Sequence, residues 1–520
     1  MKHKQVAQGA LWNAAGYLLG GSLAVLYPVL FVYWLGRSAY GLVSYLALIV
    51  SQSYLLNLGL GEAMAQRLTV AVSRGNLSEG IAFVRAALTG VWLMSAGLGL
   101  WWMIFGVEGL CLILPLEAAG QRLLYSSRAW LPPAMWGIQT GMLLSWIPIA
   151  LGRFRSAAAH TLLQTLWQAF FPLFILAISP MQSPETALKS IFLGYFLYGL
   201  SMWILAWRWL STYPLPGQIA LLGPLLKKSI WSGLQGIGAI PYTFTERTLI
   251  GRWASLELMG FYSAVHFILS KAIAIAVKGL ESLFPVFGSV ADSPTRQVLR
   301  LSQTVWFISL GAGILTLGAL GSLALLLLLL PVRIELHERV ILGMGIGFFV
   351  AQLPIIPITT FLQSRGYFRQ LFWINLLPIA AVLLLSPIFV AYRLFFLANI
   401  FGAVGWMVIY IFFTLEGKTA RALWRAWVLP TYGKMLLVCG VGIAAYIFLP
   451  KYIGREVGTI GAAASLWGLA VGLILSEKSG SLWGAKRDLL FQTLLSVRGL
   501  AQSMRGGFFR PLRKASPNNR

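Results

Sequence analysis

Charged residues are scarce in this chain. Only 11% of its 520 residues are Asp, Glu, Lys or Arg, and only two of them are Asp. A soluble domain carries about 25% charged residues, so the chain lacks the side chains that a soluble protein of this length needs to cover its surface. The scarcity therefore excludes an ordinary soluble enzyme. Negative charge is the rarer sign, with 15 acidic against 40 basic residues and a net charge of +25.

Groups that bind metals or catalyse reactions are also few. Cys111 and Cys439 lie far apart in apolar surroundings and form no CxxC pair, and no two of the four histidines stand at metal-ligand spacing. The sequence has no paired aspartates and no nucleophile elbow. We therefore expect that the protein holds no metal or cofactor and is not an enzyme. A membrane glycosyltransferase, polymerase or ligase would also need a longer polar loop than the chain offers.

Hydrophobic residues make up 58% of the chain, and they fall into blocks of about 20 separated by short polar stretches. About 20 apolar residues form a helix that crosses the hydrocarbon core of a bilayer. Transmembrane β-strands would be shorter and would alternate in polarity. The blocks predict an all-α polytopic membrane protein with about fourteen transmembrane helices, at about 9–35, 40–60, 81–105, 132–151, 158–178, 187–209, 231–251, 260–282, 303–330, 341–362, 371–390, 394–414, 433–450 and 457–475.

The segment Gly106–Leu116 is apolar but too short to cross a membrane alone. We interpret 106–118 as an interfacial segment on the outer side. Basic residues concentrate in alternate loops, and the rule that such loops stay inside places both termini in the cytoplasm. An even number of spans agrees with this orientation. The expected location is therefore the plasma (cell inner) membrane.

The net positive charge does not predict a nucleic-acid partner, because no basic domain stands outside the hydrophobic blocks. Basic loops facing anionic membrane lipid explain it. The basic tail 477–520 contains Leu482–Leu500, which either lies on the membrane as an amphipathic helix or belongs to a solvated tail. We expect a monomer.

An internal repeat is visible without gaps. Placing Trp12 on Trp231 also places Trp34 on Trp253 and Gly41 on Gly260 at the same offset. A second pair of similar segments is Gly152-Arg-Phe-Arg and Gly366-Tyr-Phe-Arg, at a slightly smaller offset. The repeat predicts two six-helix halves, 1–214 and 215–415, followed by two additional helices in 416–476 and the tail 477–520.

Six helices per half is an even number, so both halves enter the membrane from the same side. Parallel repeats of this kind occur in secondary transporters, where the substrate path runs between the halves. The duplication therefore favours an alternating-access transporter.

Three segments resemble a known family. They are Leu35-Gly-Arg-Ser-Ala-Tyr-Gly-Leu-Val-Ser with Leu58-Gly-Leu-Gly, then Leu151-Gly-Arg-Phe-Arg, and the stretch from Glu246-Arg-Thr-Leu-Ile-Gly-Arg to Met259-Gly-Phe-Tyr-Ser-Ala. They are similar to bacterial polysaccharide flippases of the multidrug/oligosaccharidyl-lipid/polysaccharide exporter superfamily, and the likeness in layout extends over nearly the whole chain. The resemblance implies a flippase that moves undecaprenyl-pyrophosphate-linked oligosaccharide to the outer leaflet for O-antigen, capsule or exopolysaccharide synthesis. The family usually has an acidic residue before the arginine of the seventh helix, and here it is Glu246.

Ionisable residues inside predicted spans are the candidate substrate-binding residues, because charge at mid-bilayer costs about 2.5–3.5 kcal/mol and is rare without a function. Lys271 lies deepest, and Lys278 follows it two turns later on the same stripe. Arg247 stands near the outer end of its span beside Glu246, and Arg85 lies near an inner end. Cations suit a pyrophosphate or acidic sugar, while simple snorkelling or salt bridges remain the structural alternative.

Two alternatives come from the same superfamily. A multidrug or cation exporter would need buried carboxylates to exchange its substrate for H⁺ or Na⁺, yet the first predicted span has none and both Asp292 and Asp488 lie outside the spans. A lipid II flippase would also need a cationic cavity, but residues 9–35 contain no Lys or Arg. The sequence leaves the sugar and any Na⁺ or H⁺ coupling open.

Overall fold

The computed structural model describes residues 26–114, 116–211, 219–281, 301, 304–305, 335–364, 367–414, 421 and 424–452. These residues form helices joined by short turns, and no strand occurs among them. The all-α fold class predicted from the hydrophobic blocks is confirmed. The predicted span at 457–475, most of the span at 303–330 and the basic tail lie outside the described residues.

The N-terminal group of helices follows the helical segment Leu26–Leu35. It comprises α2 (Arg37–Gln52), η1 (Ser53–Asn57), α3 (Leu60–Ser73), α4 (Leu77–Trp101), η2 (Trp102–Gly106), α5 (Val107–Ile113), α6 (Ala118–Ser127), η3 (Arg128–Trp130), α7 (Leu131–Ala150), α8 (Phe154–Thr165), η4 (Leu166–Phe170), α9 (Phe171–Ile178) and α10 (Pro184–Leu210).

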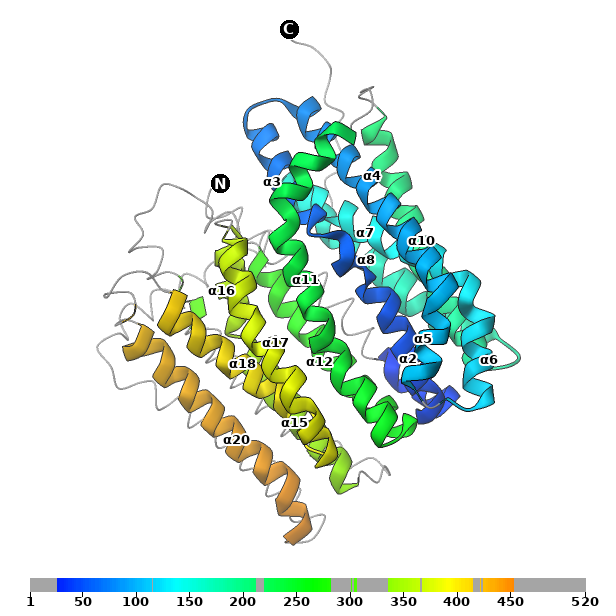
Figure 1. Ribbon diagram of the computed structural model, residues 1–520, viewed down its shortest axis with the longest axis vertical. Coiled ribbons are helices and arrows are strands. Elements are labelled where there is room, and N and C mark those ends of the chain that lie inside the picture. The colour runs from blue at the N-terminus through cyan, green and yellow to red at the C-terminus, as the bar shows by residue number, and fades with distance from the viewer. Residues whose placement is uncertain are drawn as a thin grey trace, which may run out of the picture.

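The C-terminal group lies beside it, and its helices α11 and α12 are the ones nearest to the N-terminal group in Figure 1. It comprises α11 (Ile219–Trp253), α12 (Leu256–Glu281), α15 (Leu336–Gln352), α16 (Ile355–Ser364), α17 (Phe368–Ala391), α18 (Leu397–Ile409), η5 (Tyr410–Thr414), η6 (Trp424–Val428) and α20 (Leu429–Tyr452). The two predicted domain limits, 214/215 and 415/416, fall in stretches that the structure does not describe.

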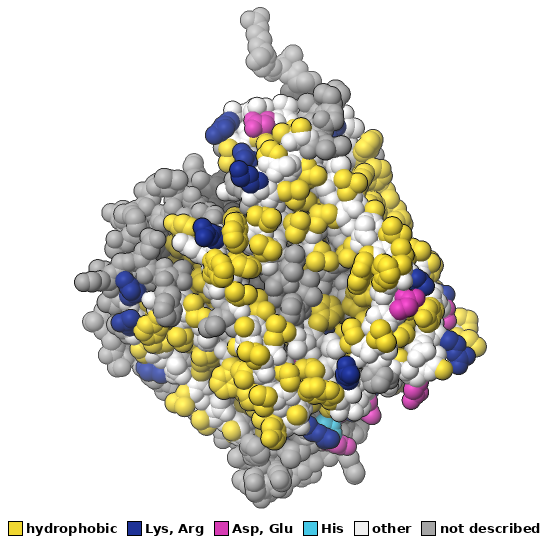
Figure 2. All heavy atoms as spheres, in the orientation of Figure 1, with side chains coloured by type: hydrophobic (Ala, Val, Ile, Leu, Met, Phe, Trp, Pro, Cys, Tyr) yellow, Lys and Arg dark blue, Asp and Glu magenta, His cyan; other side chains and the backbone are white. Residues whose placement is uncertain are grey.

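The chain is a multi-pass membrane protein. Among its described residues five helices are long and apolar enough to cross a bilayer, and the bent pair His337–Gln352 and Ile355–Gln363 adds a sixth. Large apolar side chains such as Leu112, Leu384 and Leu437 are more than two-thirds exposed, as expected of surfaces that face lipid. Figure 2 shows hydrophobic side chains over most of one face, with charged side chains mainly toward its periphery.

The structure corrects three details of the predicted spans. Gly106–Ile113 is not a separate helix, because α4 continues through η2 into α5 as one candidate span, Leu77–Ile113, and its position at the outer interface stays a prediction. The seventh span begins at Ile219, so Lys227 lies within α11 rather than in a loop. The second span ends in η1, and the chain turns at Leu58 and Gly59, which both have positive φ. Hydropathy missed these features because it does not register where an apolar helix bends or starts early.

The two groups meet most closely where α2 crosses α12. A Cβ atom added to Gly41 would lie 2.4 Å from the carbonyl oxygen of Leu256, and one added to Gly260 would lie 2.0 Å from that of Arg37. Only glycine permits backbones to approach so closely, as in other membrane helix pairs. One apolar core continues across this contact, because Val43 and Leu46 of α2 share it with Tyr262 and Val265 of α12.

Helix limits agree with the predicted repeat at both of its offsets. The starts of α2 and α12, Arg37 and Leu256, are separated by the same offset as Trp12 and Trp231. The starts of α8 and α17, Phe154 and Phe368, are separated by the same offset as Gly152 and Gly366. These correspondences support the repeat, while the division into four domains stays a prediction.

A backbone hydrogen bond repeats along with the helix limits. Before α8 the N–H of Arg153 donates to the carbonyl oxygen of Pro148 at 2.7 Å, and before α17 the N–H of Tyr367 donates to that of Leu362 at 2.9 Å. Both bonds span five residues and close the end of the preceding helix. The two turns therefore share a local geometry as well as a sequence pattern.

Candidate functional site

Two buried charged side chains lie where α2 faces α11 and α12. Arg247 and Glu246 are neighbours on α11, and both side chains are buried, at 4% and 1% exposure. About 100° of rotation separates neighbouring residues on a helix, so the two side chains point to different partners. The structure shows no ion pair between them, and each has an environment of its own.

The phenol groups of Tyr40 and Tyr45 on α2 and of Tyr262 on α12 lie close enough to Arg247 to interact with its charge. Its Nε atom has no hydrogen-bond partner among the described residues. Tyr45 is held in place by a 2.7 Å hydrogen bond between its hydroxyl and that of Thr248. The arrangement buries a positive charge near three tyrosines at the contact between the two groups. A buried charge inside a membrane span costs free energy and is rare without a function.

Glu246 contacts residues of the C-terminal group. Its Oε2 atom accepts hydrogen bonds from the Tyr262 hydroxyl (2.6 Å) and from the backbone N–H of Phe396 (3.1 Å), and Asn399 lies beside it. Phe396 precedes α18 with a left-handed φ of 65°, and its ring stacks on that of Tyr262 at 4.4 Å. The Oε1 atom of Glu246 is buried without a partner among the described residues. The carboxylate therefore joins α11, α12 and the start of α18.

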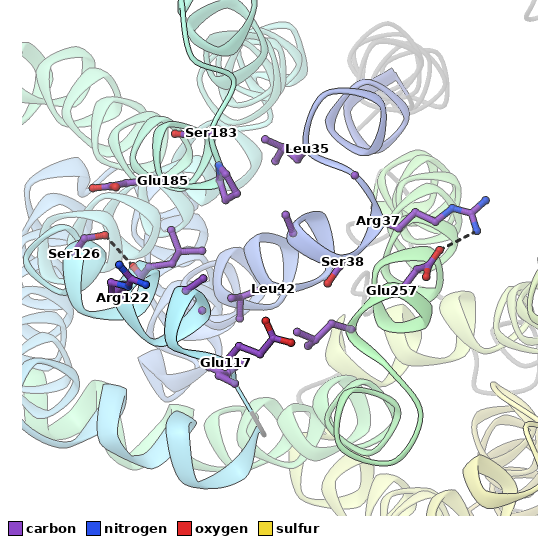
Figure 3. Close-up of a pocket in the computed structure, with 18 residues that line it drawn as sticks. Leu35, Arg37, Ser38, Leu42, Glu117, Arg122, Ser126, Ser183, Glu185 and Glu257 are labelled. Carbon is purple, nitrogen blue, oxygen red and sulfur yellow. Dashed lines mark hydrogen bonds and ion pairs between the residues drawn. The ribbon is translucent and has the colours of Figure 1, made fainter.

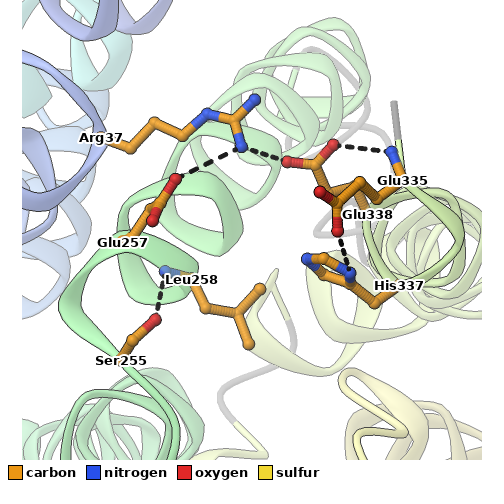
Figure 4. A network of polar contacts seen from close by, with 7 residues as sticks. All are labelled: Arg37, Ser255, Glu257, Leu258, Glu335, His337 and Glu338. Carbon is orange, nitrogen blue, oxygen red and sulfur yellow. Dashed lines mark hydrogen bonds and ion pairs between the residues drawn. The ribbon is translucent and has the colours of Figure 1, made fainter. Parts of the chain in front are cut away.

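A network of charged side chains joins the groups at the end of the bundle where α2, α6, α10, α12 and α15 begin, which we call the Arg37 end. The Arg37 guanidinium pairs with Glu338 on α15 and lies 3.7 Å from Glu257 on α12. Glu338 is only 2% exposed, and its other oxygen accepts the backbone N–H of Glu335 at 3.0 Å. Figure 4 shows the network, including the 3.1 Å contact of Glu335 with His337. These contacts link the two groups at the Arg37 end.

Beside this network is a pocket of about 1130 Å³, which we call the rim pocket. Its walls come from the starts of α2, α6, α10 and α12, as Figure 3 shows. The labelled polar side chains around it are Arg37, Ser38, Glu117, Arg122, Ser126, Ser183, Glu185 and Glu257. It is large enough for a ligand of several rings.

The other three predicted site residues are Lys271, Lys278 and Arg85. Lys271 lies near the middle of α12 and Lys278 seven residues further on, but their side chains are outside the part of the structure that is described. Arg85 donates a hydrogen bond to the carbonyl oxygen of Leu210, the last residue of α10. That contact stabilises a helix end, so Arg85 has a structural role, and its role toward substrate stays a prediction.

Sequence reasoning did not single out Tyr262, Glu338 or Glu257. The repeat offset could have drawn attention to Glu257. It places the start of α12 on the start of α2, which makes Leu256 the counterpart of Arg37, and Glu257 is the next residue. For Glu338 the sequence offers no comparable signal, since 301 residues separate it from Arg37.

No family model and no curated protein matches the chain. Solved structures do match. The lipid II flippase MurJ in its inward closed conformation has a TM-score of 0.60 at 12% identity, over 90% of this chain and 99% of MurJ. The eukaryotic MATE transporter AtDTX14 has a TM-score of 0.58 at 14% identity, over 83% of this chain and 97% of its own.

The MATE multidrug transporter DinF-BH has a TM-score of 0.55 at 15% identity, over 79% of this chain and 95% of its own. Identities this low show the fold alone. The chain thus has the fold of membrane transporters and flippases, which agrees with the architecture that the sequence resemblance implied. None of these three structures is a polysaccharide flippase.

Proposed function

We propose that this chain is a flippase that moves an undecaprenyl-pyrophosphate-linked oligosaccharide across the membrane for polysaccharide synthesis. The observation that carries the proposal is Arg247, a buried cation whose Nε has no partner among the described residues, at the contact between the two helix groups. A pyrophosphate would supply the missing partner, because charge-assisted hydrogen bonds from arginine to phosphate are strong. Lys271, near the middle of α12, would add a second cation on the same path.

The mechanism that follows is alternating access. With the Arg37 end closed by Arg37, Glu257 and Glu338, substrate reaches the path from the opposite end. Arg247 is buried, with Tyr40 and Tyr45 of α2 near its charge, so in this mechanism α2 moves away from α11 before an anion contacts it. Separation at the Arg37 end then releases the lipid to the other leaflet.

A transport assay tests the proposal. The protein is reconstituted in liposomes with a fluorescent undecaprenyl-pyrophosphate-oligosaccharide in one leaflet, and its appearance in the other leaflet is measured. Lys271→Ala and Arg247→Gln should abolish transport or lower it at least tenfold. The matched control is Arg252→Gln, because Arg252 is an exposed arginine on the same helix and its loss should leave transport unchanged. Equal transport by all three variants would show that Lys271 and Arg247 do not bind the substrate.

A multidrug or cation exporter is the second candidate, and Glu246 favours it. Such exporters need a carboxylate that exchanges a cation for H⁺ or Na⁺, and Glu246 is buried with one oxygen that has no partner among the described residues. In the flippase the same carboxylate would serve Na⁺ or H⁺ coupling. Efflux of a cationic dye without movement of the lipid would establish this candidate instead. Transport of lipid II in the same liposomes would identify the third possibility, a lipid II flippase.

A further inference from the structure

The rim pocket lies apart from Arg247 and Glu246, and none of the functions discussed above uses it. It opens at the Arg37 end, where a substrate would leave if that end is the outer one. Glu117 and Arg122 stand at the start of α6, and neither forms an ion pair with a described residue. Glu117 can only accept hydrogen bonds when ionised, and Arg122 can only donate them; Arg122 donates one to Ala118 within its own helix at 3.4 Å.

The remaining charges of the pocket are already balanced. Glu185 pairs with Lys189 at 2.7 Å, and Glu257 lies 3.7 Å from Arg37. The pocket therefore presents one exposed acidic and one exposed basic group that are not ion-paired with described residues, together with the hydroxyl groups of serines at the starts of α2 and α10. A ligand that satisfies this wall must itself carry both donors and acceptors.

We propose that the rim pocket is a carbohydrate-binding site that receives the glycan of the transported lipid. Sugar hydroxyls donate and accept hydrogen bonds, so one ring can meet Glu117 and Arg122 together. Apolar side chains between these groups, among them Leu42 and Leu123, suit the C–H faces of a sugar ring. The volume of about 1130 Å³ exceeds that of a typical small-molecule site, as a glycan of several sugars requires.

Other ligands fit this wall less well. A pyrophosphate would meet the carboxylates of Glu117, Glu185 and Glu257, and like charges repel. An organic cation would meet Arg37 and Arg122 instead. An acyl chain would displace water from Glu117 and Arg122 without replacing its hydrogen bonds, which costs free energy. The balance of charges thus favours a neutral, hydroxyl-rich ligand.

Protection of a cysteine from labelling tests the site. The full chain carries Ala119→Cys in the pocket wall, with Cys111 and Cys439 replaced by Ser, and is labelled by a membrane-impermeant maleimide. The probe is the oligosaccharide released from the surface polysaccharide of the host, at millimolar concentration. The control positions the new cysteine at Tyr392, which is 75% exposed in the turn between α17 and α18 and outside the pocket.

The oligosaccharide should slow labelling at position 119 and not at position 392. Arg122→Gln and Glu117→Gln should each weaken the protection roughly tenfold, since each removes hydrogen bonds to a charged group. Both residues are solvent-exposed, so these variants should still fold. Protection by inorganic pyrophosphate or by a rhodamine cation in place of the oligosaccharide, or no protection at all, would overturn the site.

The site rests on the proposed function for its substrate, and the two can fail separately. Lipid flipping in liposomes without protection at position 119 would keep the flippase and reject the pocket. Protection by oligosaccharide in a protein that does not flip the lipid would keep the carbohydrate site and reject the flippase.

Discussion

Gly41 and Gly260 touch across the contact between α2 and α12, and the contact is reciprocal. Gly41 packs against the backbone of Leu256, and Gly260 packs against the backbone of Arg37. The repeat offset relates Gly41 to Gly260 and Arg37 to Leu256. Exchanging the two halves of the repeat therefore turns the contact of Gly41 with Leu256 into the contact of Gly260 with Arg37. Contacts of this form arise around a two-fold axis. The finding supports a parallel duplication whose axis passes between these two helices.

Substituting Gly260 by alanine should destabilise this contact. The new Cβ atom would lie 2.0 Å from a backbone oxygen that cannot rotate away, and overpacking of this kind costs about 1–3 kcal/mol. The thermal midpoint of the purified protein should fall. Gly405→Ala on α18 is the control, because its Cβ would meet nothing within 4 Å and alanine favours a helix. Equal midpoints for the two variants would contradict the close approach.

Replacing Glu338 by glutamine should open the Arg37 end. The change removes the buried negative charge that pairs with Arg37, and because the Arg37 side chain is 38% exposed, the cost should be below the roughly 3–5 kcal/mol of breaking a fully buried pair. Spin labels at Met181 and Tyr392, both more than 70% exposed near this end in the N-terminal and C-terminal groups respectively, should show longer distances. Glu335→Gln is the control, since Glu335 is 73% exposed and contacts only His337 among the described ion-pair partners. Unchanged distances in both variants would show that the network does not hold the groups together.

Removing the hydroxyl of Tyr262 should cost more stability than removing that of Tyr432. Tyr262 donates to the Glu246 carboxylate at 2.6 Å, whereas Tyr432 donates to the backbone oxygen of Ala351 at 3.0 Å. Hydrogen bonds to charged groups contribute about 1.5–3 kcal/mol and neutral ones about 1 kcal/mol. Chemical unfolding of Tyr262→Phe and Tyr432→Phe in the same detergent provides the comparison. A larger loss for Tyr432→Phe would indicate that Glu246 does not carry the charge assigned to it.

The orientation of the chain can be tested at two exposed turns. Asn76 lies between α3 and α4 and should face the cytoplasm, and Met181 lies between α9 and α10 and should face outward. Cysteine at Met181 should react with an impermeant reagent in intact cells, and cysteine at Asn76 only after lysis. The opposite pattern would invert the predicted topology.

The candidate site was only partly accessible to sequence reasoning. A charge inside an apolar block is visible in the sequence, which is why Arg247 and Glu246 could be proposed at all. Their separation was also predictable, because neighbours on a helix point about 100° apart. The proximity of Tyr40 and Tyr45 to Arg247, and the hydrogen bond from the backbone N–H of Phe396 to Glu246, were not predictable, since these partners lie far along the chain from α11.

The sequence by itself determined that this protein is an all-helical membrane protein, roughly where its helices run, and that two of its segments repeat. These are local properties, because a run of about 20 apolar residues must form a helix in lipid wherever its neighbours lie. Only the tertiary structure decided that Arg37 meets Glu338 across 301 residues, that α4 continues into α5, and that four helix starts enclose the rim pocket. Those features depend on how each helix is rotated and where it crosses another, and hydrophobicity along the chain does not specify either.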